Sequence, residues 1–169
     1  MTSSDTTQTM EMMARPRQEH QWLKKFLGEW TVEGRMAEPG QPEQTYTGQE
    51  SYRALGDLWI VGESSGDMPD GNRMIMIEIF GYDPDKQRFV GSQVMSVMPQ
   101  MWIYEGMLDE AGNALTMDST GPDMFGDRPE ARYQDVMEFE SDDHRILTSY
   151  VFEANGEWRQ IHQAHYRRA

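Results

Sequence analysis

The stretch Gly28-Glu29-Trp30 marks the point where the sequence stops following a helical pattern and begins to follow a strand pattern. Just upstream, apolar residues between Trp22 and Leu27 recur with helical spacing. A glycine such as Gly28 is typical of the position that ends a helix. A tryptophan two residues later is large enough to lie across the end of a closed sheet. We therefore expect a short amphipathic helix, and structural roles for Gly28 and Trp30 at the closed end of a barrel.

Downstream of Gly28 the apolar residues follow a period of two, which is typical of strands. The sequence predicts ten strands, near residues 29–37, 44–54, 57–66, 73–82, 87–98, 101–109, 113–119, 131–140, 145–154 and 157–167. Turn residues separate them, and Asn155-Gly156 is the strongest hairpin signal. An open sheet of this size would leave two unpaired edges, which closure removes. The predicted fold is all-β, an antiparallel up-and-down β-barrel of eight to ten strands with one short N-terminal helix.

Length and composition limit the classes of function. The length of 169 residues predicts a single barrel domain over 15–169, and the composition of residues 1–14 predicts a disordered tail. The formal net charge of −14 disfavours binding to nucleic acid or to a membrane surface. The sequence has no cysteine, which excludes disulfides and thiolate metal sites. The first thirteen residues lack the pattern of a secretory signal, so we expect a cytoplasmic protein.

Several strands carry apolar residues on both faces, so both faces are expected to be covered. In 73–82, for example, isoleucines occupy one face, whereas Met74, Met76 and Phe80 share the other with Glu78. We expect the inner face to line a cavity and the outer aliphatic face of the middle strands to form a homodimer. Carboxylates within the strands suggest a hydrated, polar lumen. The irregular segment 121–130 is either a lid over the barrel mouth or a plain surface connection.

No catalytic or metal-binding motif is recognisable, so catalytic residues are not assigned. His162 and His165 lie three apart on one predicted strand and therefore on opposite faces, which prevents joint chelation. The aspartates around Asp83-Pro84-Asp85 lack calcium-loop spacing and fit turns better. We expect no metal and no cofactor.

The order and spacing of several motifs resemble the calycin superfamily of lipocalin and fatty-acid-binding-protein barrels, and more closely a bacterial family of unknown function within it. The matching stretches are His20-Gln21-Trp22-Leu23, Gly28-Glu29-Trp30, Leu58-Trp59-Ile60-Val61-Gly62-Glu63, Phe80-Gly81-Tyr82-Asp83, Phe89-Val90-Gly91-Ser92 and Tyr166-Arg167-Arg168. The resemblance implies an internal cavity and a basic partner for Trp30, either Arg167 or Arg168. Nitrobindin-like relatives bind haem, but Val32 replaces a glycine that their pattern would have.

The function that these observations favour is non-catalytic binding of a small apolar or amphipathic molecule in the lumen. The residues expected to contact the ligand are Arg53, Glu63, Met76, Met95, Tyr104, Glu105 and Met107. Two alternatives remain. One is an enzyme that uses a lumen carboxylate such as Glu105 as its base, and the other is a haem protein that uses His162 or His165.

Overall fold

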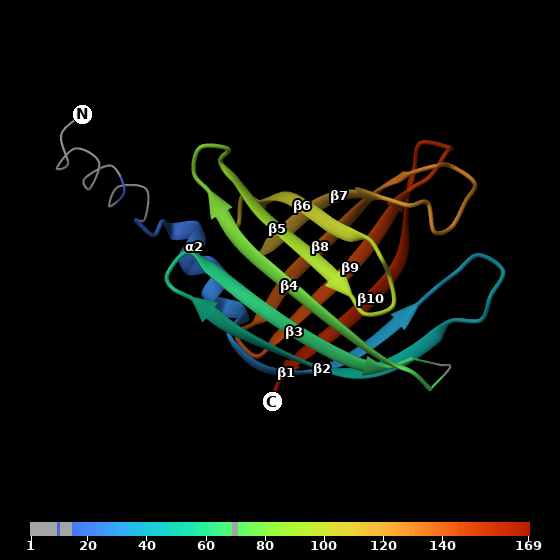
Figure 1. The fold of residues 1–169 in the computed structure, drawn as a ribbon, viewed down its shortest axis with the longest axis horizontal. Coiled ribbons are helices and arrows are strands. Elements are labelled where there is room, and N and C mark those ends of the chain that lie inside the picture. Colours follow the sequence, from blue (N-terminus) through green and yellow to red (C-terminus); the bar gives the residue numbers. More distant parts are fainter. Residues whose placement is uncertain (1–9, 11–14, 69–70) are drawn as a thin grey trace.

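The computed structural model describes residue 10, residues 15–68 and residues 71–169. The tail expected over 1–14 therefore falls outside the described residues, apart from Met10. A barrel of strands holds a short helical segment against one of its ends (Figure 1). Within these described ranges, no helix is both long and apolar enough to cross a membrane.

The helical segment consists of the α-helix α2 (Gln18–Leu23) and the 3₁₀-helix η1 (Lys24–Phe26). Its apolar spacing buries Trp22, Leu23 and Phe26 against the barrel. The indole of Trp22 donates a hydrogen bond to the carbonyl oxygen of Gly112 across 2.8 Å, which joins the segment to a turn between two distant strands. The expected short N-terminal helix is confirmed, with a 3₁₀ turn at its end.

Ten antiparallel strands follow. They are β1 (Gly28–Met36), β2 (Gln44–Leu55), β3 (Trp59–Asp67), β4 (Arg73–Asp83), β5 (Arg88–Met95), β6 (Met101–Leu108), β7 (Ala114–Gly121), β8 (Ala131–Ser141), β9 (His144–Phe152) and β10 (Trp158–Arg168). Each strand pairs with its sequence neighbours, and β1 pairs with β10 to close the barrel. The predicted up-and-down β-barrel is confirmed, at the upper end of the expected strand number.

The two ends of the barrel differ. The connections β1–β2, β3–β4, β5–β6, β7–β8 and β9–β10 lie at one end, which we call the mouth. Segment α2–η1 lies at the opposite end, which we call the closed end (Figure 1). This arrangement follows from the up-and-down topology, because alternate connections must fall at the same end.

Trp30 is the centre of the closed end, with only 1% of its surface exposed. Its indole donates a 2.7 Å hydrogen bond to the carbonyl oxygen of Phe26. The guanidinium carbon of Arg168 lies 4.3 Å from the centre of the Trp30 ring. Arg168 also donates to the carbonyl oxygens of Leu27 at 2.7 Å and Asp142 at 2.9 Å. One arginine therefore ties the helical segment, β10 and the β8–β9 turn to the tryptophan.

Gly28 is needed for this arrangement. Its φ of +111° lies in the region that favours glycine, and a Cβ there would approach the Arg168 guanidinium to 3.0 Å. Any side chain at this position would therefore be strained and would crowd the arginine that covers Trp30.

Candidate functional site in the barrel lumen

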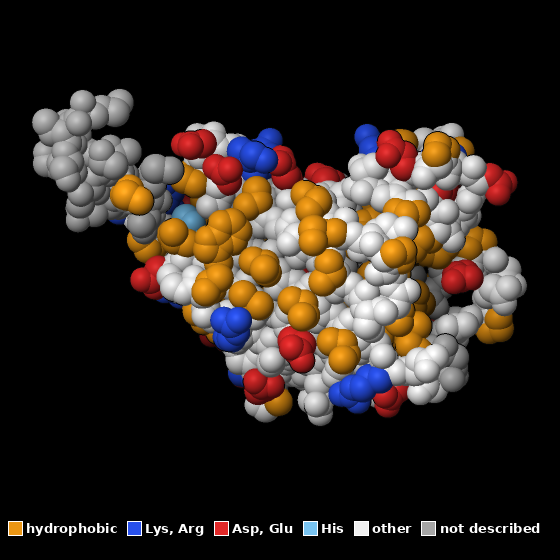
Figure 2. Space-filling view, viewed as in Figure 1, with side chains coloured by type: hydrophobic (Ala, Val, Ile, Leu, Met, Phe, Trp, Pro, Cys, Tyr) orange, Lys and Arg blue, Asp and Glu red, His pale blue; other side chains and the backbone are white. Residues whose placement is uncertain are grey.

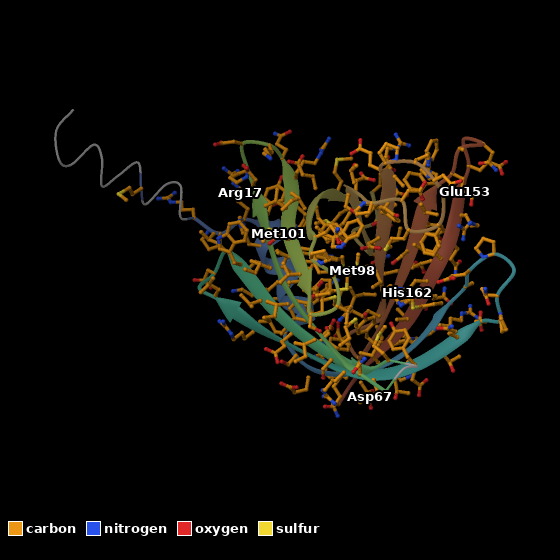
Figure 3. All side chains as sticks on the ribbon, turned by 45° about the vertical axis from the view of Figure 1, so that its right-hand side comes forward. Arg17, Asp67, Met98, Met101, Glu153 and His162 are labelled. Carbon is orange, nitrogen blue, oxygen red and sulfur yellow. The ribbon has the colours of Figure 1, made fainter. Side chains whose placement is uncertain are left out.

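The side chains that point into the barrel change in character from the closed end toward the mouth. Buried aromatic and aliphatic residues form one packed cluster that extends from the helical segment to Trp102, Tyr133 and Val151 near the mouth. Nearer the mouth, several inward side chains are only half-buried; they include Tyr46, Met76, Gln93, Met95, Ser149 and His162. The lumen is therefore packed at the closed end and also at the mouth beside β6 and β8, where Trp102 and Tyr133 are buried, and it is accessible on the remaining side of the mouth. Figure 3 shows Met98 on the β5–β6 side of this interior and His162 on the β10 side.

Hydrogen-bonding side chains on the inner face follow one another around the wall of the lumen. We call this set the lumen network; it comprises Tyr46, Tyr52, Glu78, Gln93, Tyr104, Asp135, Ser149 and His162. Its members come from seven strands, β2, β4, β5, β6, β8, β9 and β10. Each hydrogen bond of the network joins two different strands, so the network is complete only when the strands are assembled in the closed barrel.

Tyr46 begins the network by reaching across a neighbouring strand. The Tyr46 hydroxyl on β2 and Nε2 of His162 on β10 are 2.6 Å apart, although β1 lies between these strands. The strand between them has Gly34 at the crossing point, and a Cβ there would overlap the Tyr46 ring. On its other side, Nδ1 of His162 lies 3.4 Å from the Ser149 hydroxyl. The absence of a side chain at Gly34 thus leaves the space through which Tyr46 of β2 reaches His162 of β10.

Tyr52 makes the same kind of crossing on the other side of β2. Its hydroxyl donates a short hydrogen bond to Glu78 on β4, and the intervening strand β3 has Gly62 beneath the ring. Gln93 donates to the second oxygen of Glu78 at 3.1 Å. The Tyr104 hydroxyl lies 3.5 Å from the Gln93 side-chain oxygen. Both oxygens of Glu78 therefore accept hydrogen bonds inside the barrel.

Asp135 on β8 completes the set. It forms side-chain hydrogen bonds with Tyr104 and with Ser149, so it connects the two halves of the network. Burial raises the pKa of Asp135, and burial likewise raises the pKa of Glu78. The hydrogen bonds they accept work in the opposite direction, because they stabilise the ionised form.

Burial also sets the charge state of the other titratable groups in the network. It lowers the pKa of His162 to about 4 and raises the pKa of Tyr46 to about 12. Both side chains are therefore neutral near pH 7. The Tyr46–His162 contact is a hydrogen bond between neutral groups.

An ion pair crosses the lumen next to the network, on the side of the closed end. Arg145 on β9 pairs with Glu50 on β2, and both side chains are almost completely buried. The guanidinium carbon of Arg145 lies 3.7 Å from the centre of the Tyr166 ring and 5.1 Å from that of Trp30. Ser64 donates to Glu50 at 3.1 Å. Aromatic faces and one carboxylate thus hold a cation inside the barrel.

The network and this ion pair enclose a small cavity of about 30 Å³, which we call the deep cavity. Its wall is formed by Glu50, Tyr52, Met76, Glu78, Phe80, Gln93, Tyr104, Asp135, Met137, Arg145, Leu147 and Tyr166. A larger cavity of about 490 Å³ lies at the mouth between the β7–β8 connection and the β9–β10 hairpin. We call this one the mouth cavity.

The β7–β8 connection, which contains most of the irregular segment 121–130, is held at two points. The Tyr133 hydroxyl donates to the carbonyl oxygen of Pro122 at 2.6 Å and accepts from the Met124 amide at 3.1 Å. Arg128 donates to Asp123 at 2.7 Å and to the carbonyl oxygen of Phe152 at 2.8 Å. Phe125 packs against the core and lines the mouth cavity, whereas Met124 is exposed.

Three of the residues expected to contact a ligand lie on the inner face. Met76 and Tyr104 line the deep cavity, and Met95 packs against the buried cluster beside them. The register pairs Met76 with Met95 on adjacent strands. The structure therefore brings these three together.

The other four lie on the outer face. Arg53, Glu63, Glu105 and Met107 are exposed, and their strand neighbours Tyr52, Gly62, Tyr104 and Gly106 face inward. Glu105 forms an ion pair with Lys86 on the surface. It is thus not a lumen carboxylate, and Glu78 and Asp135 occupy the interior instead. Because both faces of these strands are rich in apolar residues, periodicity alone did not identify the inner one.

The two C-terminal histidines lie on opposite faces, as their spacing requires. His162 belongs to the lumen network, and both of its ring nitrogens have neighbours there. His165 lies outside, where its Nδ1 is 3.0 Å from Nε2 of His144. No group of three or more potential metal ligands occurs within the described part of the chain. A haem ligand role for His162 would require breaking its contact with Tyr46.

Sequence reasoning missed three members of the site: Arg145 and Tyr52, which are buried, and Asp135, which is half-buried. One signal could have found part of it. Gly34 and Gly62 interrupt otherwise regular strands, and a glycine inside a strand often marks a close approach by another group. Here the approaching groups are the rings of Tyr46 and Tyr52.

The fold and site together define a ten-stranded antiparallel barrel with a plugged closed end and a polar, partly accessible lumen. The chain belongs to the family described as "Protein of unknown function (DUF1579)", whose match spans residues 15–168. The expected membership in a family of unknown function is thereby confirmed. No curated protein matches the sequence.

Solved structures show the same fold at low sequence identity. The S-type phycobiliprotein lyase CPES from Guillardia theta is 14% identical, with a TM-score of 0.60, over 94% of this chain and 96% of that chain. Rv2717c from M. tuberculosis is 11% identical, with a TM-score of 0.62, over 92% of this chain and 99% of that chain. At such identities the likeness concerns the fold alone.

Proposed function

We propose that this protein binds a small amphipathic molecule in its lumen. The observation that carries the proposal is the lumen network, which offers hydrogen-bonding groups inside the barrel and is only half-buried at Tyr46, Gln93 and His162. Binding sites of this kind combine an apolar wall with a few placed polar groups. The apolar body of the ligand would lie against Met76, Met95 and Met98, and its polar end would reach the network.

Native mass spectrometry of freshly purified protein tests this proposal, because a ligand that copurifies adds its mass to the protein. The matched variants are Ser149→Trp and Thr148→Trp, which place the same ring on opposite faces of β9. We expect Ser149→Trp to fill the lumen and abolish the adduct, and Thr148→Trp to keep it. Retention of the adduct by a folded Ser149→Trp protein would place the ligand elsewhere and refute the proposal.

We also propose that the protein forms a homodimer through the outer face of β4, β5 and β6. This face carries exposed apolar side chains, namely Ile75, Ile77, Ile79, Val94, Met101, Ile103 and Met107. Met101 and Ile103 have 62% and 59% of their surface exposed. Apolar side chains gather on the face that carries β4 and β5 (Figure 2). Contiguous apolar patches beyond a few hundred Å² typically mark an interface.

Sedimentation equilibrium at micromolar concentration tests the dimer. We expect the unmodified protein to sediment as a dimer and an Ile77→Glu/Ile103→Glu variant to sediment as a monomer. Thr148→Glu on β9 places one new carboxylate outside the patch and should leave the dimer intact. A strictly monomeric unmodified protein would rule out this interface.

A cytoplasmic location is part of the same proposal. The net charge of −14 keeps the protein surface strongly hydrated and repels anionic lipid. Cell fractionation with antibody detection should recover the protein in the cytosolic fraction, and recovery with membranes would contradict this assignment.

A further inference from the structure

The deep cavity contains more carboxyl groups than cations. Glu50, Glu78 and Asp135 line it, together with a single basic residue, Arg145. Arg145 already pairs with Glu50. Among the described residues, neither Glu78 nor Asp135 forms an ion pair with a lysine or arginine. Buried carboxylates are normally compensated by a cation, so this cavity has a place for one that the chain does not supply.

The aromatic wall of the deep cavity suits a cation as well. The rings of Tyr52, Phe80, Tyr104 and Tyr166 contribute to it. One of these rings already carries a cation on its face, because the guanidinium carbon of Arg145 lies 3.7 Å from the centre of Tyr166. Aromatic faces attract cations most strongly where water is excluded.

The size of the deep cavity restricts the cation. Its volume is about 30 Å³. A site needs at least ~10–15 Å³ of such volume to hold one water molecule, so roughly two water-sized groups fit. A primary ammonium group is of this size, whereas a trimethylated ammonium is much larger.

A separate observation concerns Arg145, which lines the deep cavity. Nε of Arg145 has no hydrogen-bond partner among the described residues, and only 2% of Arg145 is exposed. A buried donor without a partner normally has a water or a ligand beside it. The deep cavity would then hold two groups, an ammonium group and one water that accepts a hydrogen bond from Nε of Arg145.

The connections around the mouth favour the entry of cations. Their described residues include seven carboxylates and one arginine, Arg128; the carboxylates are Glu38, Glu43, Asp123, Asp127, Glu130, Glu153 and Glu157. A rim of one sign raises the local concentration of ligands of the opposite sign. A cationic ligand would therefore meet a favourable potential before it enters the lumen.

We propose that the lumen ligand is an amphipathic primary amine whose ammonium group binds in the deep cavity between Glu78 and Asp135. This inference rests on the proposed function and specifies its ligand class. The ammonium group donates hydrogen bonds to the two carboxylates, and its alkyl or aryl chain extends past Met76 and Met95 toward the mouth.

The test compares three probes with the same eight-carbon chain: octylamine, 1-octanol and octanoate. Isothermal titration calorimetry at pH 8 measures their affinities for the full-length protein. We expect octylamine to bind at least tenfold more tightly than 1-octanol, and octanoate to bind most weakly. Equal binding of amine and alcohol, or a preference for octanoate, would overturn the amine assignment.

Two variants locate the ammonium group. Glu78→Gln and Asp135→Asn keep the side-chain shapes and should each weaken octylamine binding about tenfold, and 1-octanol binding by a clearly smaller factor because the alcohol carries no charge. Glu63→Gln, which removes an exposed carboxylate from β3, is the matched control and should not alter octylamine binding. Loss of amine affinity in the control, or its retention in both lumen variants, would contradict the assignment.

The pH dependence provides a readout that needs no variant. Burial raises the pKa of both carboxyls, so their ionised forms become populated as the pH rises, and octylamine affinity should rise over the same range. The other titratable groups that face them are Glu50 and Tyr52 on β2, Tyr104 on β6, Arg145 on β9 and Tyr166 on β10. An affinity that falls with rising pH in this range would refute the proposal.

The outcomes separate the two proposals. If 1-octanol or octanoate binds better than octylamine and Ser149→Trp abolishes that binding, the lumen is a binding site but the amine assignment fails. If none of the three probes binds and no copurified ligand is found, both proposals fail.

Discussion

The closed end and the lumen both combine aromatic and charged side chains, but the charged groups are satisfied in different ways. At the closed end, Trp30 is fully buried, and Arg168 uses its guanidinium to satisfy backbone carbonyl oxygens and cover the ring. In the lumen, Glu78 and Asp135 are held by hydrogen bonds from neutral groups and have no basic partner among the described residues. The first arrangement stabilises the fold. The second retains polar groups that packing alone would not favour, which is typical of a site kept for a ligand.

The largest effect should come from the closed end. Trp30→Ala removes a fully buried ring and should lower the free energy of unfolding by ~3–5 kcal/mol, because the cavity it leaves cannot collapse. Denaturant titration followed by circular dichroism measures the loss. The matched control is Trp59→Ala, since 39% of that tryptophan is exposed, and its loss should be less than half as large. Equal losses would show that the burial of Trp30 makes no special contribution to stability.

The pH dependence of stability should reveal the neutral histidine of the lumen. Burial lowers the pKa of His162 from 6.5 to about 4, so the unfolded chain takes up the proton first. Stability should therefore fall as the pH drops from about 6.5 to about 4, by roughly 3 kcal/mol in total. Thermal melts across this range should show a flatter profile for His162→Gln. His165→Gln removes a histidine outside the lumen, and it should leave most of the slope in place.

Arg168→Lys tests how the closed end is sealed. Lysine keeps the charge but not the planar fork that donates to several carbonyl oxygens at once, so about 2 kcal/mol of stability should be lost. The neighbouring variant Arg167→Lys, at an exposed position, should change the free energy of unfolding by less than ~0.5 kcal/mol. Indistinguishable results for the two variants would mean that charge alone covers Trp30.

The smallest expected effect concerns Glu78. Burial raises its pKa, so the folded protein holds this proton longer than the unfolded chain as the pH rises from 4.5. The contribution of Glu78 to stability therefore falls through that range, and the stability of Glu78→Gln relative to the unmodified protein should rise progressively with pH. Urea titrations at two pH values, with Glu63→Gln as control, measure this difference. A variant that loses stability at the higher pH would contradict it.

Much of the architecture could be predicted because turns and strand period are local signals. Turn residues such as Asn155-Gly156 separate strands whose observed bounds lie close to the predicted ones, and closure follows from the absence of any other cover for the edges. The orientation of each strand was harder. In β4, Ile75, Ile77 and Ile79 face outward and Glu78 faces inward, which reverses the usual expectation for apolar and charged residues.

The site depended on contacts that no local pattern specifies. Tyr46 and His162 are 116 residues apart in sequence and meet only because Gly34 lets the ring cross β1. Arg145 and Glu50 likewise pair across the closed barrel. Such contacts depend on the strand register and the shear of the closed barrel, which the sequence pattern does not reveal. Met76, Met95 and Tyr104 could therefore be placed near the lumen, whereas the Arg145–Glu50 ion pair could not.

The pairing of β1 with β10 also has a consequence for how the chain folds. Arg168 donates to the carbonyl oxygen of Leu27 across 141 residues of sequence. Closing a loop of that length costs about 4 kcal/mol in chain entropy beyond a constant term. No contact can offset this entropy cost until β10 has been synthesised. The barrel therefore has to remain an open sheet with two exposed edges while it emerges from the ribosome, and sealing of the closed end is expected to be a late and slow event in folding.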